Sequence, residues 1–209
     1  MTDQKLKWHE WKPGLMGDNL TLGEVMATMP ASDAEEVPDV IRHYENPSSP
    51  WALPGAVSLD RHDCIHVLLG RGLTVQDEAF VIGVTMGAAS DITDGAVQCY
   101  EYVSTQLFPK PWQFSSKHLH AFRLGLGFAQ SNIPALDLHL IPLETSGYQD
   151  CRIDEIRRGL GLNRSVLRSY NAMETLLIPD SRSSRRLGRC PGLSDQALAL
   201  PTRDELVAA

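Results

Sequence analysis

Residues 58–66 read Ser-Leu-Asp-Arg-His-Asp-Cys-Ile-His, and after eleven further residues the chain reaches Glu78. Ser58 is a favourable N-cap for the apolar run that follows it, and Gly70 is a typical left-handed C-cap, so the pattern predicts a helix over residues 59–69. Thr74 predicts the start of a second helix, with Glu78 in its first turns. The short turn between the two lets the second helix run back along the first.

On the first predicted helix, His62 and His66 lie one turn apart on the same face, because side chains at i and i+4 are neighbours. Asp63 lies beside them, three residues before His66. Asp60 and Arg61 fall on roughly the opposite side, so the histidine face points into the protein if these two face water. Buried polar side chains need partners, and this face therefore predicts a polar site inside the protein.

His62, Asp63, His66 and Glu78 together predict a site for one divalent cation. Imidazole and carboxylate ligands suit zinc, iron, manganese or cobalt, and a site without cysteine is closer to an open catalytic site than to a closed structural one. Two alternatives need no metal. His66 could be a core histidine oriented by Asp63, and Glu78 could be a first-turn acid favoured by the helix macrodipole.

The spacing His62-Asp63-x-x-His66, eleven residues, Glu78 resembles, without a gap, the metal motif of the coenzyme Q (ubiquinone) biosynthesis protein four family. The segment from Phe80 to Gly87 is similar to the small-residue helix of that family. The specific part of the likeness covers about thirty residues. Outside it, the likeness is to a helical chain of similar length.

The resemblance implies an all-α fold, a bound divalent metal that is usually zinc, and an apolar tunnel for a polyprenyl chain. It implies a part in ubiquinone biosynthesis, as an oxidative C1 decarboxylase (a lyase) of a prenylated quinone precursor, as a scaffold for other quinone-biosynthesis proteins, or as both. His62, Asp63, His66 and Glu78 are the residues that carry over as site residues.

Gly83 and Gly87 lie four residues apart in the second predicted helix. In one interpretation they line the tunnel and bind substrate, because glycines leave room for a flexible lipid chain. In the other they allow a neighbouring helix to pack closely, since the run is too short to span a membrane.

The rest of the chain predicts helices and no sheet. We expect one all-α domain, a bundle of six to eight helices over residues 1–179, and a basic, poorly ordered tail over residues 180–209. Residues 133–150 are expected to form a long, packed loop. Apolar periodicity, caps and breakers predict the other main helices over residues 94–107, 115–131, 151–160 and 163–177.

The composition narrows the class of protein. A net charge of −7 speaks against non-specific binding to nucleic acid. Four cysteines without a CxxC pair fit reduced thiols, and no signal or transit segment is recognisable, so we expect a cytoplasmic protein. Trp8 and Trp11, among lysines, could contact a membrane peripherally on its cytoplasmic face, or pack on the domain or on the partner of a homodimer.

Three functions remain open. The first is a metal-dependent enzyme in which the metal polarises an oxygen of the quinone precursor and Asp63 or Glu78 acts as a base. The second is a non-catalytic scaffold that binds the prenyl lipid or another long-chain lipid. The third is a metal phosphohydrolase using His43, His62, Asp63 and Asp137, which leaves Glu78 without a role.

Overall fold

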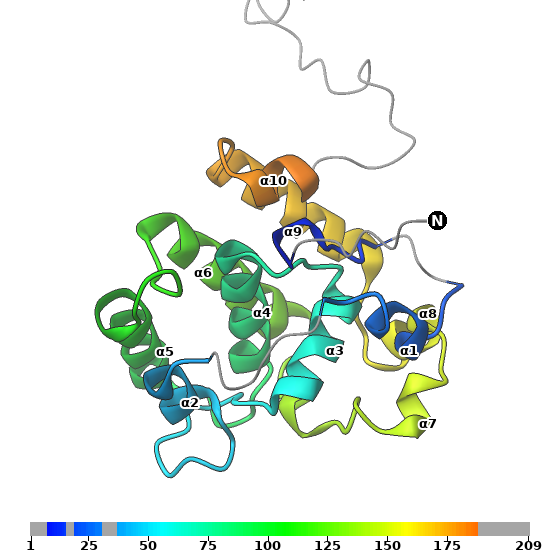
Figure 1. Cartoon of the computed structure of the whole chain (residues 1–209), viewed down its shortest axis with the longest axis horizontal. Helices are drawn as coiled ribbons and strands as arrows, with labels where there is room; N and C mark the ends of the chain where they lie inside the picture. Colours follow the sequence, from blue (N-terminus) through cyan, green and yellow to red (C-terminus); the bar gives the residue numbers. More distant parts are fainter. Residues whose placement is uncertain (1–7, 16–18, 31–36, 188–209) are drawn as a thin grey trace, which may run out of the picture.

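The computed structural model describes residues 8–15, 19–30 and 37–187. Within these ranges the regular elements are helices, and strand pairing is limited to an isolated bridge between Thr21 and Arg152. The expected all-α class is confirmed. The α-helices, shown in Figure 1, are α1 (Leu22–Met26), α2 (Asp39–Glu45), α3 (Leu59–Leu69), α4 (Val75–Gly87), α5 (Asp94–Tyr102), α6 (Ser116–Asn132), α7 (Ser146–Gln149), α8 (Ile153–Gly159), α9 (Arg164–Leu177) and α10 (Arg182–Leu187).

The ten α-helices of the described residues exceed the expected six to eight because several of them are short. For example, α7 has four residues and α10 has six. Short 3-10 helices add η1 (Trp8–Glu10) and η4 (Leu138–Leu140), and α5 continues into a π-helical turn, η3 (Val103–Leu107). None of the helices in the described ranges is long and apolar enough to cross a membrane.

The centre of the fold is the crossing of α4 and α6. A Cβ atom on Gly83 would lie 2.1 Å from the carbonyl oxygen of Phe122, and one on Gly125 would lie 2.1 Å from that of Phe80. Both distances are shorter than any real contact, so only glycine allows the two backbones to come this close. Gly87 makes the same kind of approach, 2.6 Å from the carbonyl oxygen of Leu126.

Gly83 and Gly87 therefore face α6, and neither lines the cavity described below. The interpretation that they form a tunnel wall and bind substrate is wrong, and the close-packing alternative is the one the structure supports. The reason is helical geometry, since α4 presents Ile82, Thr85 and Met86 to the cavity and the glycines lie on a different face.

The connection between α3 and α4 is a tight turn. The helix predicted over residues 59–69 is confirmed, and it ends at Gly70 with a φ of 67°. Thr74 caps α4 through a reciprocal pair of hydrogen bonds with Asp77. Ser58 occupies the N-cap position of α3, but its side chain makes no capping hydrogen bond.

The far side of α3 does not face water as expected at Arg61. The guanidinium of Arg61 makes two hydrogen bonds with the Glu144 carboxylate, at 2.8 and 2.6 Å, and a third with the carbonyl oxygen of His139. Gln149 contacts Cys64 of the same helix. Residues within 133–150 therefore cover α3 at Arg61 and Cys64, while Asp60 is exposed as expected.

The predicted boundary at residue 180 is wrong. Helix α10 continues the domain, and Ser183 and Ser184 are buried in it. The basic composition of this segment suggested a solvated tail, but Ser183, Ser184 and Leu187 are buried, and Arg186 donates to the carbonyl oxygen of His9. Residues 188–209 of the expected tail lie outside the described residues.

Candidate metal centre

His62, His66 and Glu78 each bring one possible ligand atom to a common point. Oε2 of Glu78 lies 2.9 Å from Nε2 of His62 and 3.2 Å from Nε2 of His66, and the two Nε2 atoms are 3.0 Å apart. Three corners of a tetrahedral zinc site with bonds of about 2.1 Å would lie roughly 3.4 Å apart. The three atoms are thus close to the spacing that a single ion requires.

Among the described residues, one group of three or more histidine, cysteine, aspartate or glutamate side chains has ligand atoms that all lie within 4.8 Å of one another. It consists of His62, His66 and Glu78. Its geometry follows from local sequence. The i, i+4 spacing stacks the two imidazoles on α3, and the cap at Thr74 places Glu78 in the first turn of α4, directly across the turn. We call His62, His66 and Glu78 the metal triad.

The orientation of His66 is fixed by the turn. Its Nδ1 lies 2.8 Å from the carbonyl oxygen of Gly72 and must donate to it, because a carbonyl only accepts. In the neutral ring, Nε2 then carries its lone pair toward the triad, as a metal-binding histidine requires. The orienting partner is therefore Gly72, and the alternative in which Asp63 orients His66 is wrong.

Arg71, fully buried between the two turn glycines, ties this turn to α9. Its guanidinium forms an ion pair of 2.7 Å with Glu174, donates to Asn171 at 2.8 Å, and lies 3.6 Å from the centre of the Phe80 ring. Sequence reasoning did not find this arginine or its partners. The sequence of α9 gives no signal for them, because Asn171 and Glu174 are buried through their contacts with Arg71, a distant residue.

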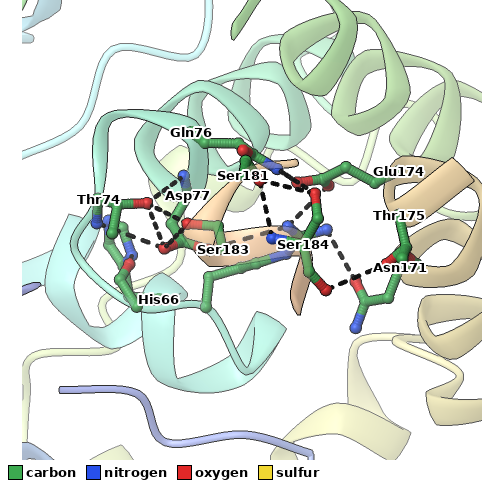
Figure 2. Close-up of polar contacts among 12 residues, drawn as sticks. His66, Thr74, Gln76, Asp77, Asn171, Glu174, Thr175, Ser181, Ser183 and Ser184 are labelled. Carbon is green, nitrogen blue, oxygen red and sulfur yellow. Dashed lines mark hydrogen bonds and ion pairs between the residues drawn. The ribbon is translucent and has the colours of Figure 1, made fainter. Parts of the chain in front are cut away.

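Helix α10 closes the same network from the other side, as Figure 2 shows. Gln76 donates to both Glu174 and Ser184, the latter at 3.0 Å, and Ser183 donates to Asp77 at 3.2 Å. Because Asp77 also caps α4, the start of the helix that carries Glu78 is held by two segments distant in sequence, α9 and α10.

The charges of the triad are coupled. Burial alone would raise the pKa of the Glu78 carboxyl, but the charge of His66 and the hydrogen bonds from both imidazoles bring that pKa well below its usual range. Burial opposes the charged form of His62, yet its hydrogen bond with Glu78 and the charge of Glu78 raise its pKa. Positive charge is thus favoured at this point, and a divalent cation would supply it in place of the imidazole protons.

Asp63, the fourth predicted ligand, is not part of the group. As the neighbour of His62 it leaves the helix about 100° away, so it lies beside the triad and lines the cavity instead. Burial raises the pKa of its carboxyl, although the charges of His62 and His66 oppose that rise. The structure thus assembles three of the four residues expected to bind metal.

The triad opens into a cavity of about 780 Å³. Its wall includes His62 and Glu78 from the triad, together with Asp63. Cavities of roughly 300–1,000 Å³ are typical of sites that enclose small molecules. Most of the remaining wall is apolar, and includes Ile41, Leu53, Val57, Leu73, Ile82 and Met86.

A second polar group in the cavity was not predicted. Glu45, the last residue of α2, accepts a hydrogen bond of 2.9 Å from the hydroxyl of Tyr100 on α5, and both residues line the cavity. A weak signal was available, since Glu45 follows the buried Ile41 by one turn and shares its face.

The residues of the phosphohydrolase alternative do not come together. His43 is exposed and its ring stacks on that of Trp51, with centroids 5.8 Å apart. Asp137 accepts a hydrogen bond from the backbone N–H of Ser90. Neither joins the triad.

Comparisons of the chain with protein-family models, with curated proteins and with solved structures find no match.

Proposed function

We propose that this protein is a zinc-dependent enzyme of ubiquinone biosynthesis that modifies the head group of a prenylated quinone precursor. The observation that carries the proposal is the position of the metal triad in the wall of a large, mainly apolar cavity. A lipid chain fits the apolar wall, and its polar head would then lie at His62 and Glu78. Oxidative C1 decarboxylation is the reaction that the family resemblance implies.

Three protein ligands leave a coordination position open, as in catalytic rather than structural zinc sites. When bound, the ion would polarise an oxygen atom of the head group or activate water. Iron, cobalt and manganese suit the same donor atoms. Because His43 and Asp137 do not join the triad, the phosphohydrolase alternative lacks two of the residues that it requires.

The two carboxylates that we expected to be catalytic differ in their surroundings. The depressed pKa of Glu78 favours a role as a ligand, because a weakly basic carboxylate holds a cation but takes up protons poorly. Asp63 is the better proton acceptor, since burial raises its pKa and it lines the cavity beside the triad. Its role in this proposal is to remove a proton from the bound head group.

The proposal is tested on the purified protein by native mass spectrometry with elemental analysis of metal. We expect one zinc ion and a co-purified lipid with a long apolar chain. Ile82→Trp should fill the cavity from α4 and remove the lipid while metal content stays normal, because Ile82 lines the cavity and lies outside the triad. Leu176→Trp is the matched control, since Leu176 is 75% exposed on α9.

Equal lipid content in the wild type and Ile82→Trp would contradict the assignment of the cavity. Turnover distinguishes the enzyme from a scaffold. The zinc-loaded protein, given a prenylated hydroxybenzoate and oxygen, should release carbon dioxide. A wild type that binds metal and lipid without turnover would be the non-catalytic scaffold that presents the lipid to other quinone-biosynthesis proteins.

A further inference from the structure

The cavity wall has a second group of polar side chains besides the metal triad. Glu45 reaches it from α2 and Tyr100 from α5, and the Tyr100 hydroxyl donates to Oε1 of Glu45 at 2.9 Å. Among the described residues no hydrogen bond joins this pair to the metal triad, so the two polar groups form separate hydrogen-bond networks. The other charged or titratable side chains in the cavity wall are Arg42, Tyr44, His62, Asp63 and Glu78.

Tyr100 is held rigidly by its neighbours. Its ring stacks on that of Phe122, with centroids 5.1 Å apart and planes at 28°. The rings of Phe108 and Phe114 meet it edge-on, at 6.2 and 5.9 Å. With 1% of its surface exposed, Tyr100 fixes Oε1 of Glu45 in one position.

The other carboxyl oxygen, Oε2 of Glu45, accepts no hydrogen bond from any described residue. A purely structural link between α2 and α5 would not need a carboxyl group in the wall of an apolar cavity, where its desolvation is costly. Burial raises the pKa of Glu45 to about 7, with Glu78 adding to the rise and with His62 and the Tyr100 hydrogen bond opposing it. A carboxyl with such a pKa can both take up and release protons near neutral pH.

We propose that Glu45 is a proton-transfer residue of the cavity, acting on a hydroxyl group of the bound head group, and that Tyr100 positions it. The ligand O–H bond breaks, its electron pair stays on the ligand oxygen, and the proton forms a new O–H bond with Oε2 of Glu45. The reverse step returns the proton to the product. This inference rests on the proposed function, because it requires a ligand in the cavity.

The test uses the full-length, zinc-loaded protein and a nitrophenol that carries a long alkyl chain, with its methyl ether as a second probe. The phenolate of the first probe is coloured, so its absorbance reports where the proton is. We expect the wild type to bind both probes and to bind the phenol largely as phenolate. Glu45→Gln should lower the bound phenolate fraction about ten-fold or more, as expected for loss of a charged hydrogen-bond partner, while zinc content and ether binding stay unchanged.

Glu155→Gln is the matched control, since Glu155 is exposed on α8 and lies outside the cavity wall, and Asp63→Asn measures the contribution of the other carboxyl that lines the cavity. A phenolate fraction that is unchanged in Glu45→Gln, or that depends on Asp63 alone, would overturn the role of Glu45 and leave the cavity assignment intact. Failure of the wild type to bind either probe would overturn the proposed function together with this inference.

The role of Tyr100 has its own readout. An infrared titration of the protonated carboxyl band in the protein without probe should show a component that disappears in Glu45→Gln. In Tyr100→Phe that component should remain and its midpoint should move to higher pH, because the lost hydrogen bond stabilises the carboxylate. A midpoint that does not move would show that Tyr100 only fills space.

Discussion

At the scale of single residues, the triad depends on what each side chain can donate or accept. His66 uses Nδ1 to bind the turn at Gly72, so Nε2 is the ring atom that remains for Glu78 or for a cation. Glu78 joins both imidazoles through one oxygen atom, Oε2. Glu78 is therefore the residue that links α3 to α4 in the site, and it is the most informative one to change.

Glu78→Gln should weaken zinc binding by about 10–100-fold or more, since the charge is lost and the shape is kept. It should also remove the effect of zinc on thermal stability. A chelator should lower the melting temperature of the wild type, because bound metal stabilises only the folded state, but hardly change that of the variant. Elemental analysis and differential scanning calorimetry measure the two effects.

His120→Ala is the control for this experiment, because His120 is an exposed histidine on α6. It should keep the metal content and the response to chelator of the wild type. A wild type without stoichiometric metal, and with a melting temperature that chelator does not change, would identify the triad as a buried hydrogen-bond network.

At the scale of elements, the structure depends on two contacts of very different kinds. The crossing of α4 and α6 is a contact of backbones, made possible by Gly83, Gly87 and Gly125. The attachment of the turn between α3 and α4 to α9 is a contact of charges, made by Arg71 and Glu174. Each can be removed without touching the triad.

Gly83→Ala should lower the free energy of unfolding by about 1–3 kcal/mol or more, because its Cβ would push against the carbonyl of Phe122 and separate α4 from α6. Gly127→Ala on α6 is the matched control. Nothing lies within 4 Å of the Cβ it would add, so it should raise stability by about 0.5–1 kcal/mol through helix propensity. Urea denaturation measures both, and equal tolerance of the two would contradict the close crossing.

Arg71→Met should cost about 3–5 kcal/mol, because it leaves the carboxylate of Glu174 buried without its partner. The same change at Arg123 should cost about 1 kcal/mol or less, because Arg123 is 59% exposed in its ion pair with Glu101. The double variant Arg71→Met/Glu174→Met should recover much of the loss. A single variant no more destabilised than Arg123→Met would show that the buried pair contributes little.

At the scale of the whole molecule, the sequence predicts where helices begin and end far better than it predicts which face of each helix is buried. The C-terminal end of α3 and the start of α9 follow from local caps at Gly70 and Asn163, and the prediction placed them correctly. The buried face of α9 does not follow the apolar residues of this helix. Leu176 and Leu177 are 75% and 54% exposed, whereas Asn171 and Glu174 are buried.

The physical reason for the polar buried face of α9 is a long-range partner. Asn171 and Glu174 are buried because they bind Arg71, about a hundred residues earlier in the chain. The residue pattern of α9 by itself does not indicate this partner. Glu45 was missed for the same reason, since its partner Tyr100 lies on another helix. The triad could be predicted because all of its members lie within two adjacent helices and one turn.

These contacts divide the molecule into parts that zinc should affect differently. Amide hydrogen exchange measured with zinc and with chelator should differ most over residues 66–78, where the ion would join α3 to α4 across the turn. The crossing of α4 and α6 around Gly83 and Gly125 is held by backbone packing rather than by metal ligands, so its exchange should change little. A uniform acceleration over the whole molecule on chelation would mean that the metal supports the entire fold, as a structural ion does. A change confined to the turn fits an ion placed to act on a ligand in the cavity.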